Sequence, residues 1–201
     1  MALARLTGWR YLLAVWIAGA STLLMAAEEP SYEVLETRGD VEVRRYGPAI
    51  LAETRMKASG GDFRRLAGFI FGGNSTGESI AMTAPVQADL DGEQPQMAFF
   101  MPPEYDMGSL PEPDDAGVTL REIPARTVAV LRFSGRATDK RVTEQRNKLA
   151  QLLVAEGLEA DGTWLLNQYN PPWTPPFMRR NEIWVGIKWD DPQGSSASAA
   201  L

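Results

Sequence analysis

The feature that most limits the fold is a pattern that occurs twice along the chain. Residues 41–56 hold two extended runs with a proline between them, and residues 118–135 hold two more. A segment with helical periodicity follows each pair, and two further extended runs follow each helix. This repeated pattern predicts an internal duplication of the chain. Each half, about 31–105 and 117–190, has the order strand, strand, helix, strand, strand.

Two such halves are most simply joined in one antiparallel sheet or open barrel, with the two helices packed on it, which is an α+β fold. The later runs of each half are extended because apolar and polar side chains alternate along them. They are residues 79–90, 96–105, 163–169 and 181–189. We expect a single domain over 28–190. The tail 191–201 has low complexity and is expected to be disordered.

Both helices have recognisable ends. The first is expected to start at Asp62 as its N-cap and to stop at Gly72-Gly73. Its predicted apolar face consists of Phe63, Leu66, Ala67 and Ile70. The second helix is expected to start with Thr138 or Asp139 as its N-cap and to end at Gly157. Its apolar face is expected to include Leu149, Leu152 and Leu153.

The first 27 residues differ from the rest of the chain. Two arginines precede an uncharged, largely apolar run over residues 11–27. This order is typical of a secretory signal peptide, with cleavage after Ala20 or Ala27. The alternative is an uncleaved anchor, because the run is at the lower length limit for a spanning helix. We expect export to the periplasm or, in the alternative, an inner-membrane anchor that faces the periplasm. No other contact with a membrane is expected.

Charge and composition exclude several classes of function. Without residues 1–27 the chain has 18 basic and 26 acidic residues, a net charge of −8. Phosphate backbones repel such a protein, so nucleic-acid binding is not expected. The chain has neither cysteine nor histidine. Disulfides, thiolate nucleophiles, cysteine-based metal sites and histidine-based triads are therefore excluded.

One carboxylate stands where a general base could stand. Glu182 follows Asn181 at the start of an apolar strand. Arg179 and Arg180 are close in sequence, and an ion pair with one of them is the favoured interpretation. The chain does not contain GxxxxGK[ST], the motif of phosphate-binding loops. No catalytic residue is predicted, and the protein is not expected to be an enzyme.

A ligand surface is predicted from apolar side chains on two segments. The first helix carries several phenylalanines, and the segment NQYNPPWTPPFM (167–178) surrounds Trp173 and Phe177 with four prolines. Prolines stiffen a loop, so its aromatic side chains lose little entropy when a ligand binds. Arg179 and Arg180 follow the loop and offer cations for carboxylates. This combination suits a flat, apolar molecule with carboxylate groups, although the simpler role of these side chains is core packing.

Three segments of the chain resemble a known family, the SOUL heme-binding family. They are MTAPV (82–86), NPPWTPPFMRRNEIW (170–184) and YEVLETRGDVEVRRYGPAILAET (32–54). The resemblance extends over about 31–189. It implies a distorted antiparallel β-barrel of two βαββ-type repeats with two helices. It also implies that heme or another tetrapyrrole binds in a shallow hydrophobic groove between residues 62–71 and 170–181.

The predicted ligand residues come from both walls of this groove. They are Phe63, Leu66, Ile70, Met82, Tyr169, Trp173, Phe177, Met178, Arg179 and Arg180. Some family members are proposed to hold heme iron through histidine, which this chain lacks. The remaining candidate donors are Met56, Met82, Met178 and Tyr169, and none of them is preferred. No metal site is predicted, so affinity is expected to come from apolar burial and from arginine pairing with the propionates.

The predicted function is binding of heme or a porphyrin, for transport, buffering or sequestration. The first alternative is a GyrI-like hydrolase or small-molecule effector-binding domain. The hydrolase form of it requires Glu182 to face a cavity without an arginine partner. The second alternative is a protein-interaction module in which the proline loop docks on a partner. It requires that no concave pocket lies beside that loop.

Overall fold

A single curled sheet with two helices forms the part of the chain that the computed structural model describes, residues 27–91 and 93–189. The strands are β1 (Tyr32–Arg38), β2 (Val41–Tyr46), β3 (Ala49–Arg55), β4 (Val86–Asp89), β5 (Gln96–Phe100), β6 (Thr119–Ile123), β7 (Arg126–Phe133), β8 (Ala160–Gln168) and β9 (Asn181–Ile187). The helices are α1 (Asp62–Ile70), α2 (Asp139–Ala155) and the short 3₁₀ helix η1 (Pro176–Met178).

The expected signal segment, apart from Ala27, and the tail 191–201 lie outside the described residues. Within the described ranges, no helix is long and apolar enough to cross a membrane.

The sheet is antiparallel throughout, and its strand order is β1-β2-β7-β9-β8-β4-β5-β3-β6. The prediction of an α+β distorted barrel or sheet with two packed helices is therefore confirmed. From β2 onward, replacing β2–β5 with β6–β9 and the reverse gives the same strand order, read from the opposite edge of the sheet. This is the symmetry that a duplicated chain would produce, and the duplication itself stays a prediction.

The sheet turns where two proline corners face one another. Strands β2 and β3 follow each other across Gly47-Pro48 and pair with β7 and β6, which Pro124 separates. The pairing places Tyr46 opposite Arg126 on one side of the corner. Proline cannot donate to a strand ladder, so the pairing is interrupted here and the strands bend. As a result Arg126, the first residue of β7, lies at the inside of the bend.

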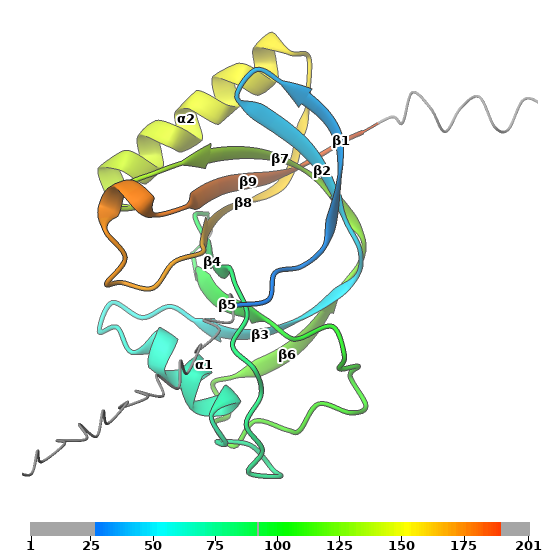
Figure 1. Ribbon diagram of the computed structural model, residues 1–201, viewed down its shortest axis with the longest axis vertical. Helices are drawn as coiled ribbons and strands as arrows, with labels where there is room; N and C mark the ends of the chain where they lie inside the picture. Colours follow the sequence, from blue (N-terminus) through cyan, green and yellow to red (C-terminus); the bar gives the residue numbers. More distant parts are fainter. Residues whose placement is uncertain (1–26, 92, 190–201) are drawn as a thin grey trace, which may run out of the picture.

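The two faces of the sheet have different environments. Both helices pack on the outer face, α1 against β3 and β5 and α2 against β7, β8 and β9 (Figure 1). Apolar side chains under the helices form two core clusters. The inner face carries a third cluster around Trp184, which is fully buried. Polar side chains fill much of the remaining inner face, and they form the site described below.

Helix α1 differs from its prediction at the start. Gly61, with φ +95°, occupies the N-cap position, and Asp62 is the first helical residue. The Asp62 carboxylate instead accepts a hydrogen bond from the backbone N–H of Lys57 at 3.2 Å. Phe69 is buried, whereas Phe63 is 50% exposed. Only one edge of the helix meets the sheet, and Phe63 lies at its border.

Helix α2 follows its prediction closely. Thr138 is the N-cap, and its hydroxyl accepts a hydrogen bond from the backbone N–H of Arg141. Leu149 and Leu153 are buried, and Leu152 packs against the same core cluster. The helix ends at Ala155, two residues before Gly157, whose φ of +67° favours glycine.

The strand predicted over 79–90 is correct only in its last part. Strand β4 begins at Val86, directly after Pro85. Before this point the chain makes single bridges, such as the one between Thr83 and Glu28. The pyrrolidine nitrogen of Pro85 cannot donate a ladder hydrogen bond, so regular pairing starts one residue later.

Candidate functional site

The proline loop between β8 and β9 is held by its own backbone and by one arginine. The backbone N–H of Thr174 donates to the Pro171 carbonyl at 3.0 Å, and that of Met178 donates to the Pro175 carbonyl at 2.9 Å. The Arg179 guanidinium donates to the carbonyls of Thr174, at 2.8 Å, and Pro172. These bonds close the loop on itself. The loop therefore presents its side chains from a defined backbone.

Three large apolar side chains of this loop point into solvent. The exposed fractions are 83% for Trp173, 78% for Phe177 and 63% for Met178. Exposed apolar residues that occur singly are ordinary, but a group of three on a stiffened loop is typical of a binding surface. These three side chains are therefore exposed, as the predicted ligand wall requires.

The first helix borders the same region of the molecule. The Phe63 ring contacts the Phe99 ring edge-on, with centroids 5.2 Å apart. Phe99 pairs with Val86 of β4, and Val86 pairs with Gln168, where β8 ends and the proline loop begins. The backbones of Phe99 and Gln168 are therefore two strand spacings apart, which is about 10 Å. In Figure 1, α1 and the loop both lie toward the left of the view.

Other predicted wall residues lie beneath this surface. Leu66 and Ile70 are fully buried in the core under α1, with exposed fractions of 0% and 1%. Met82 packs against the same cluster and is partly buried. Leu66 and Ile70 therefore offer no exposed contact to a ligand. Met56, just after β3, is 37% exposed.

Tyr169 and Arg180 belong to a partly buried polar network around Glu182. The Tyr169 hydroxyl donates to Glu182 at 2.7 Å, and the Arg180 guanidinium lies 3.4 Å from the centre of the Tyr169 ring. Arg180 also pairs with Glu29. Burial and the neighbouring Glu182 raise the pKa of the Tyr169 hydroxyl. A phenolate ligand for iron is therefore disfavoured at Tyr169.

Glu182 is a structural residue of this network. It accepts hydrogen bonds from Arg44 at 3.1 Å and from the Trp184 indole N–H at 2.8 Å, and only 2% of it is exposed. The predicted ion pair exists, but its main partner is Arg44, and Arg180 lies 3.9 Å away. Glu182 is therefore not a free base, and the condition set for a hydrolase is not met.

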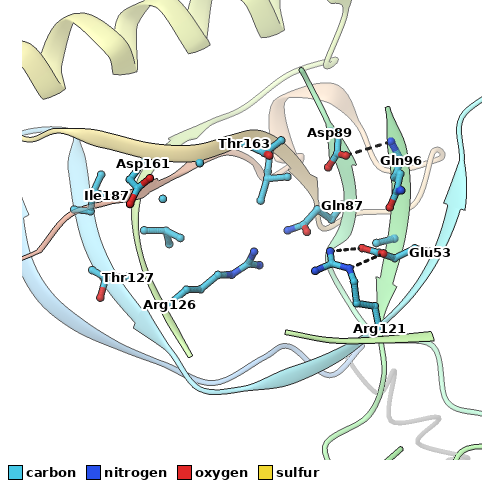
Figure 2. Close-up of a pocket in the computed structure, with 15 residues that line it drawn as sticks. Glu53, Gln87, Asp89, Gln96, Arg121, Arg126, Thr127, Asp161, Thr163 and Ile187 are labelled. Carbon is cyan, nitrogen blue, oxygen red and sulfur yellow. Dashed lines mark hydrogen bonds and ion pairs between the residues drawn. The ribbon is translucent and has the colours of Figure 1, made fainter. Parts of the chain in front are cut away.

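The inner face of the sheet encloses a polar cavity of about 450 Å³. Figure 2 shows Glu53, Arg121, Gln87 and Arg126 projecting into it from different strands. Arg121 holds Glu53 through two hydrogen bonds of 2.8 and 2.6 Å. Asp89 accepts a hydrogen bond from the backbone N–H of Gln96, and burial raises the pKa of its carboxyl group.

Sequence reasoning missed this cavity and Arg126 within it. The available signal was weak: a single arginine opens RTVAVLRF, a strand that is apolar from Val128 to Leu131. Such an arginine usually lies at the solvent-exposed end of a strand. The proline corner next to it turns Arg126 inward instead.

A second cavity, of about 540 Å³, lies on the other side of Arg126. The segment from Glu28 to Ser31, the corner at Gly47-Pro48 and the turn around Pro102-Pro103 line it. No residue of 62–71 or 170–181 lines either of these two cavities. The surface formed by α1 and the proline loop is thus separate from both. Among the described residues, no three acidic side chains are grouped in a way that would hold a metal ion.

Comparison with known proteins gives matches over nearly all of the described chain. The sequence model of the SOUL heme-binding protein family matches residues 27–186. Heme-binding protein 2 of Mus musculus is 28% identical over 183 residues, which cover 80% of this chain and 86% of the relative. Heme-binding protein 2 of Homo sapiens is 27% identical over 186 residues, covering 84% and 90%.

Among solved structures, the EcmrR C-terminal domain aligns with a TM-score of 0.57 at 12% identity, covering 79% of this chain and 99% of that domain. A hydrolase from Listeria innocua aligns with a TM-score of 0.53 at 8% identity, covering 76% and 94%. At these identities the likeness shows the fold alone. The family match spans most of the chain and includes the proline loop, so this protein belongs to the SOUL heme-binding protein family.

Proposed function

We propose that this protein binds heme or a related tetrapyrrole on the surface formed by α1 and the proline loop. The observation that supports this most is the exposure of Trp173, Phe177 and Met178 on a loop closed by its own hydrogen bonds. The family and the name of both curated relatives agree with a heme ligand. Phe63 adds a fourth exposed aromatic or apolar side chain from the helix side.

The residues present fit the macrocycle better than they fit its iron. A porphyrin is flat and apolar, and an aromatic side chain buries on the order of 150–250 Å² when it is fully covered. At roughly 25 cal/mol per Å², two such contacts stabilise the complex by several kcal/mol before the cost of association. For iron, the thioethers of Met178 and Met56 are the exposed candidate donors. Bound heme would supply its own redox chemistry, while this surface supplies orientation and burial.

Arg179 and Arg180 are already engaged by protein groups. Arg179 donates to loop carbonyls, and Arg180 pairs with Glu29 and stacks on Tyr169. Only the N–H groups that these contacts leave unused are available to bind propionates. We therefore propose that apolar contact contributes more to affinity than charge pairing does.

Removing the two aromatic side chains of the loop tests the proposal. In Trp173→Ala/Phe177→Ala we expect porphyrin to bind at least about tenfold more weakly, because exposed aromatic anchors dominate such surfaces. Hemin and protoporphyrin IX would be titrated separately and followed by absorbance. The matched control is Met107→Ala/Val154→Ala, which removes two exposed apolar side chains elsewhere. Equal affinity of the loop variant and the parent protein would contradict the wall assignment.

The same titration tests the role of iron. If apolar contact carries the binding, hemin and metal-free protoporphyrin IX bind within a few-fold of each other. Binding of hemin alone would point to a thioether ligand. Met178→Leu tests ligation by its thioether, because leucine keeps the apolar volume and removes the sulfur. Hemin affinity falls in this variant if the sulfur ligates iron, and it is unchanged if only apolar contact matters.

We further propose that the protein works after export, in transport, buffering or sequestration of its ligand. The basic start and apolar run of residues 1–27 support export. N-terminal sequencing of the protein recovered from the periplasmic fraction would identify a cleaved form. Recovery of the intact chain from the membrane fraction would favour the anchored alternative.

A further inference from the structure

One edge of a partly buried arginine inside the barrel is shielded from solvent and has no hydrogen-bond partner in the protein. Arg126 extends into the polar cavity toward Gln87, as Figure 2 shows. Its Nε and Nη2 atoms are buried and have no hydrogen-bond partner among the residues that the structure describes. A buried charged group without a partner is costly, because it has lost its hydration without replacement. An unpaired guanidinium therefore indicates a missing acceptor.

A second arginine of the same cavity shows what this edge binds. Arg121 uses its own Nε and Nη2 to hold the two carboxylate oxygens of Glu53, at 2.8 and 2.6 Å. These two nitrogens form one side of the planar guanidinium and match the spacing of a carboxylate. Arg126 has the same side of its guanidinium unpaired. The chemistry that fits it is a second carboxylate.

The charges that face the cavity leave Arg126 without a counterion. Glu53 is occupied by Arg121, and Asp89 accepts from the backbone N–H of Gln96. Asp161 lies at the exposed rim. Burial lowers the pKa of the Arg126 guanidinium, which agrees with the lack of a compensating negative charge.

A further unpaired polar atom of the inner face is also a donor. Asn167 is fully buried and accepts a hydrogen bond from Gln87 at 2.9 Å, while its Nδ2 has no partner among the described residues. The unpaired buried side-chain atoms of Arg126 and Asn167 are thus all N–H groups. On the described inner face, these unpaired donors could be satisfied by a ligand that accepts hydrogen bonds. This favours an anion over a cation.

We propose that Arg126 binds the carboxylate of a small organic acid inside the barrel. The cavity, about 450 Å³, lies within the size range of small-molecule sites. Its rim is formed by exposed residues of β8, Asp161 to Thr163, which provide a way in. The site is independent of the tetrapyrrole surface, since none of its lining residues belongs to α1 or the proline loop.

The experiment uses benzoate as a carboxylate probe and inorganic phosphate as a second oxyanion. Each is titrated into ¹⁵N-labelled protein, and the arginine Nε–H resonances are followed by NMR. We expect benzoate to shift one Nε–H resonance in a saturable way. That resonance disappears in Arg126→Gln, and benzoate binds this variant at least about tenfold more weakly, because a charge-assisted bidentate pair is lost.

Two further variants separate the binding role from a structural one. Arg126→Lys keeps the positive charge but loses the fork, so benzoate affinity falls while folding is retained. Arg132→Gln, at an exposed position of the same strand, binds as the parent does. Without ligand, Arg126→Met should melt no lower than the parent, because it removes an unpaired buried charge. A melting temperature lower by many degrees would show that Arg126 is structural and overturn the proposal.

The remaining outcomes also decide the question. Unchanged benzoate affinity in Arg126→Gln would place the binding site elsewhere. If neither probe binds, water hydrates the Nε and Nη2 edge of Arg126. Both outcomes overturn the proposal. Binding of phosphate but not benzoate overturns the carboxylate assignment. Trp173→Ala/Phe177→Ala should keep benzoate binding and Arg126→Gln should keep hemin binding, so failure of one site is distinguishable from failure of the other.

Discussion

Replacing Glu182 with alanine is expected to lower the free energy of unfolding by about 3–5 kcal/mol, the usual cost of breaking a buried ion pair from one side. The carboxylate is 2% exposed and accepts hydrogen bonds from Arg44, Tyr169 and Trp184. Without it, the buried guanidinium of Arg44 loses its buried counterion, and the Tyr169 hydroxyl and the Trp184 indole N–H lose their acceptor. Each group left unsatisfied adds a desolvation cost that alanine cannot offset.

Urea unfolding followed by circular dichroism measures this effect. The matched control is Glu42→Ala, which removes the other carboxylate bound to Arg44, at 2.8 Å. Glu42 is 39% exposed at its side chain, so its loss should cost at most about 1 kcal/mol. A second variant, Glu182→Gln, keeps an acceptor and removes the charge. Adding Arg44→Met to it should recover part of the loss, because the buried cation that has lost its buried counterion is then removed. Equal midpoints for Glu182→Ala and Glu42→Ala would contradict the assigned role.

Gly186→Ala is expected to cost about 2–3 kcal/mol, at the upper end of overpacking effects. Gly186 does not have a positive φ, so backbone strain is not the cause. A Cβ atom at this position would overlap the backbone carbonyl oxygen of Asp161. The pairing of β8 with β9 shifts register between Ala160 and Trp164, and this irregularity brings the Asp161 carbonyl over β9. Backbone cannot yield as a flexible side chain can.

The control for this substitution is Gly47→Ala. An added Cβ there has no heavy atom within 4 Å, and its φ is also ordinary. Surface changes of this kind stay within about 0.5 kcal/mol. Denaturant midpoints of both variants, compared with the parent, check the prediction. If the two glycines tolerate alanine equally well, the close approach of Asp161 is not present in solution.

The sequence by itself predicted the order of the elements from β2 onward, without the additional strand β1, and the stiffness of the proline loop. Alternation of side chains and helical periodicity depend on local geometry, so β2, β3, α2 and β9 could be predicted from them. The prolines around Trp173 and Phe177 indicated a stiff loop, and they left open whether its aromatic side chains pack in the core or form a ligand surface. In the structure these two side chains are the most exposed part of the candidate surface.

Helix α1 shows where local reasoning stops. Helical periodicity grouped Phe63 with Leu66 and Ile70, yet the structure exposes the first and buries the other two. The width of the buried face depends on how much of the helix the sheet covers. That is a property of the packed structure and not of the helix alone.

Only the tertiary structure decided the partners of the buried charges. Arg44 and Glu182 are 138 residues apart, and they meet because β7 lies between β2 and β9 in the sheet. The same strand order, with its proline corner, turns Arg126 into the barrel. The physical reason is that local preferences act over a few residues, whereas strand pairing joins distant ones. The network around Glu182 and the unpaired edge of Arg126 therefore could not be predicted from the sequence.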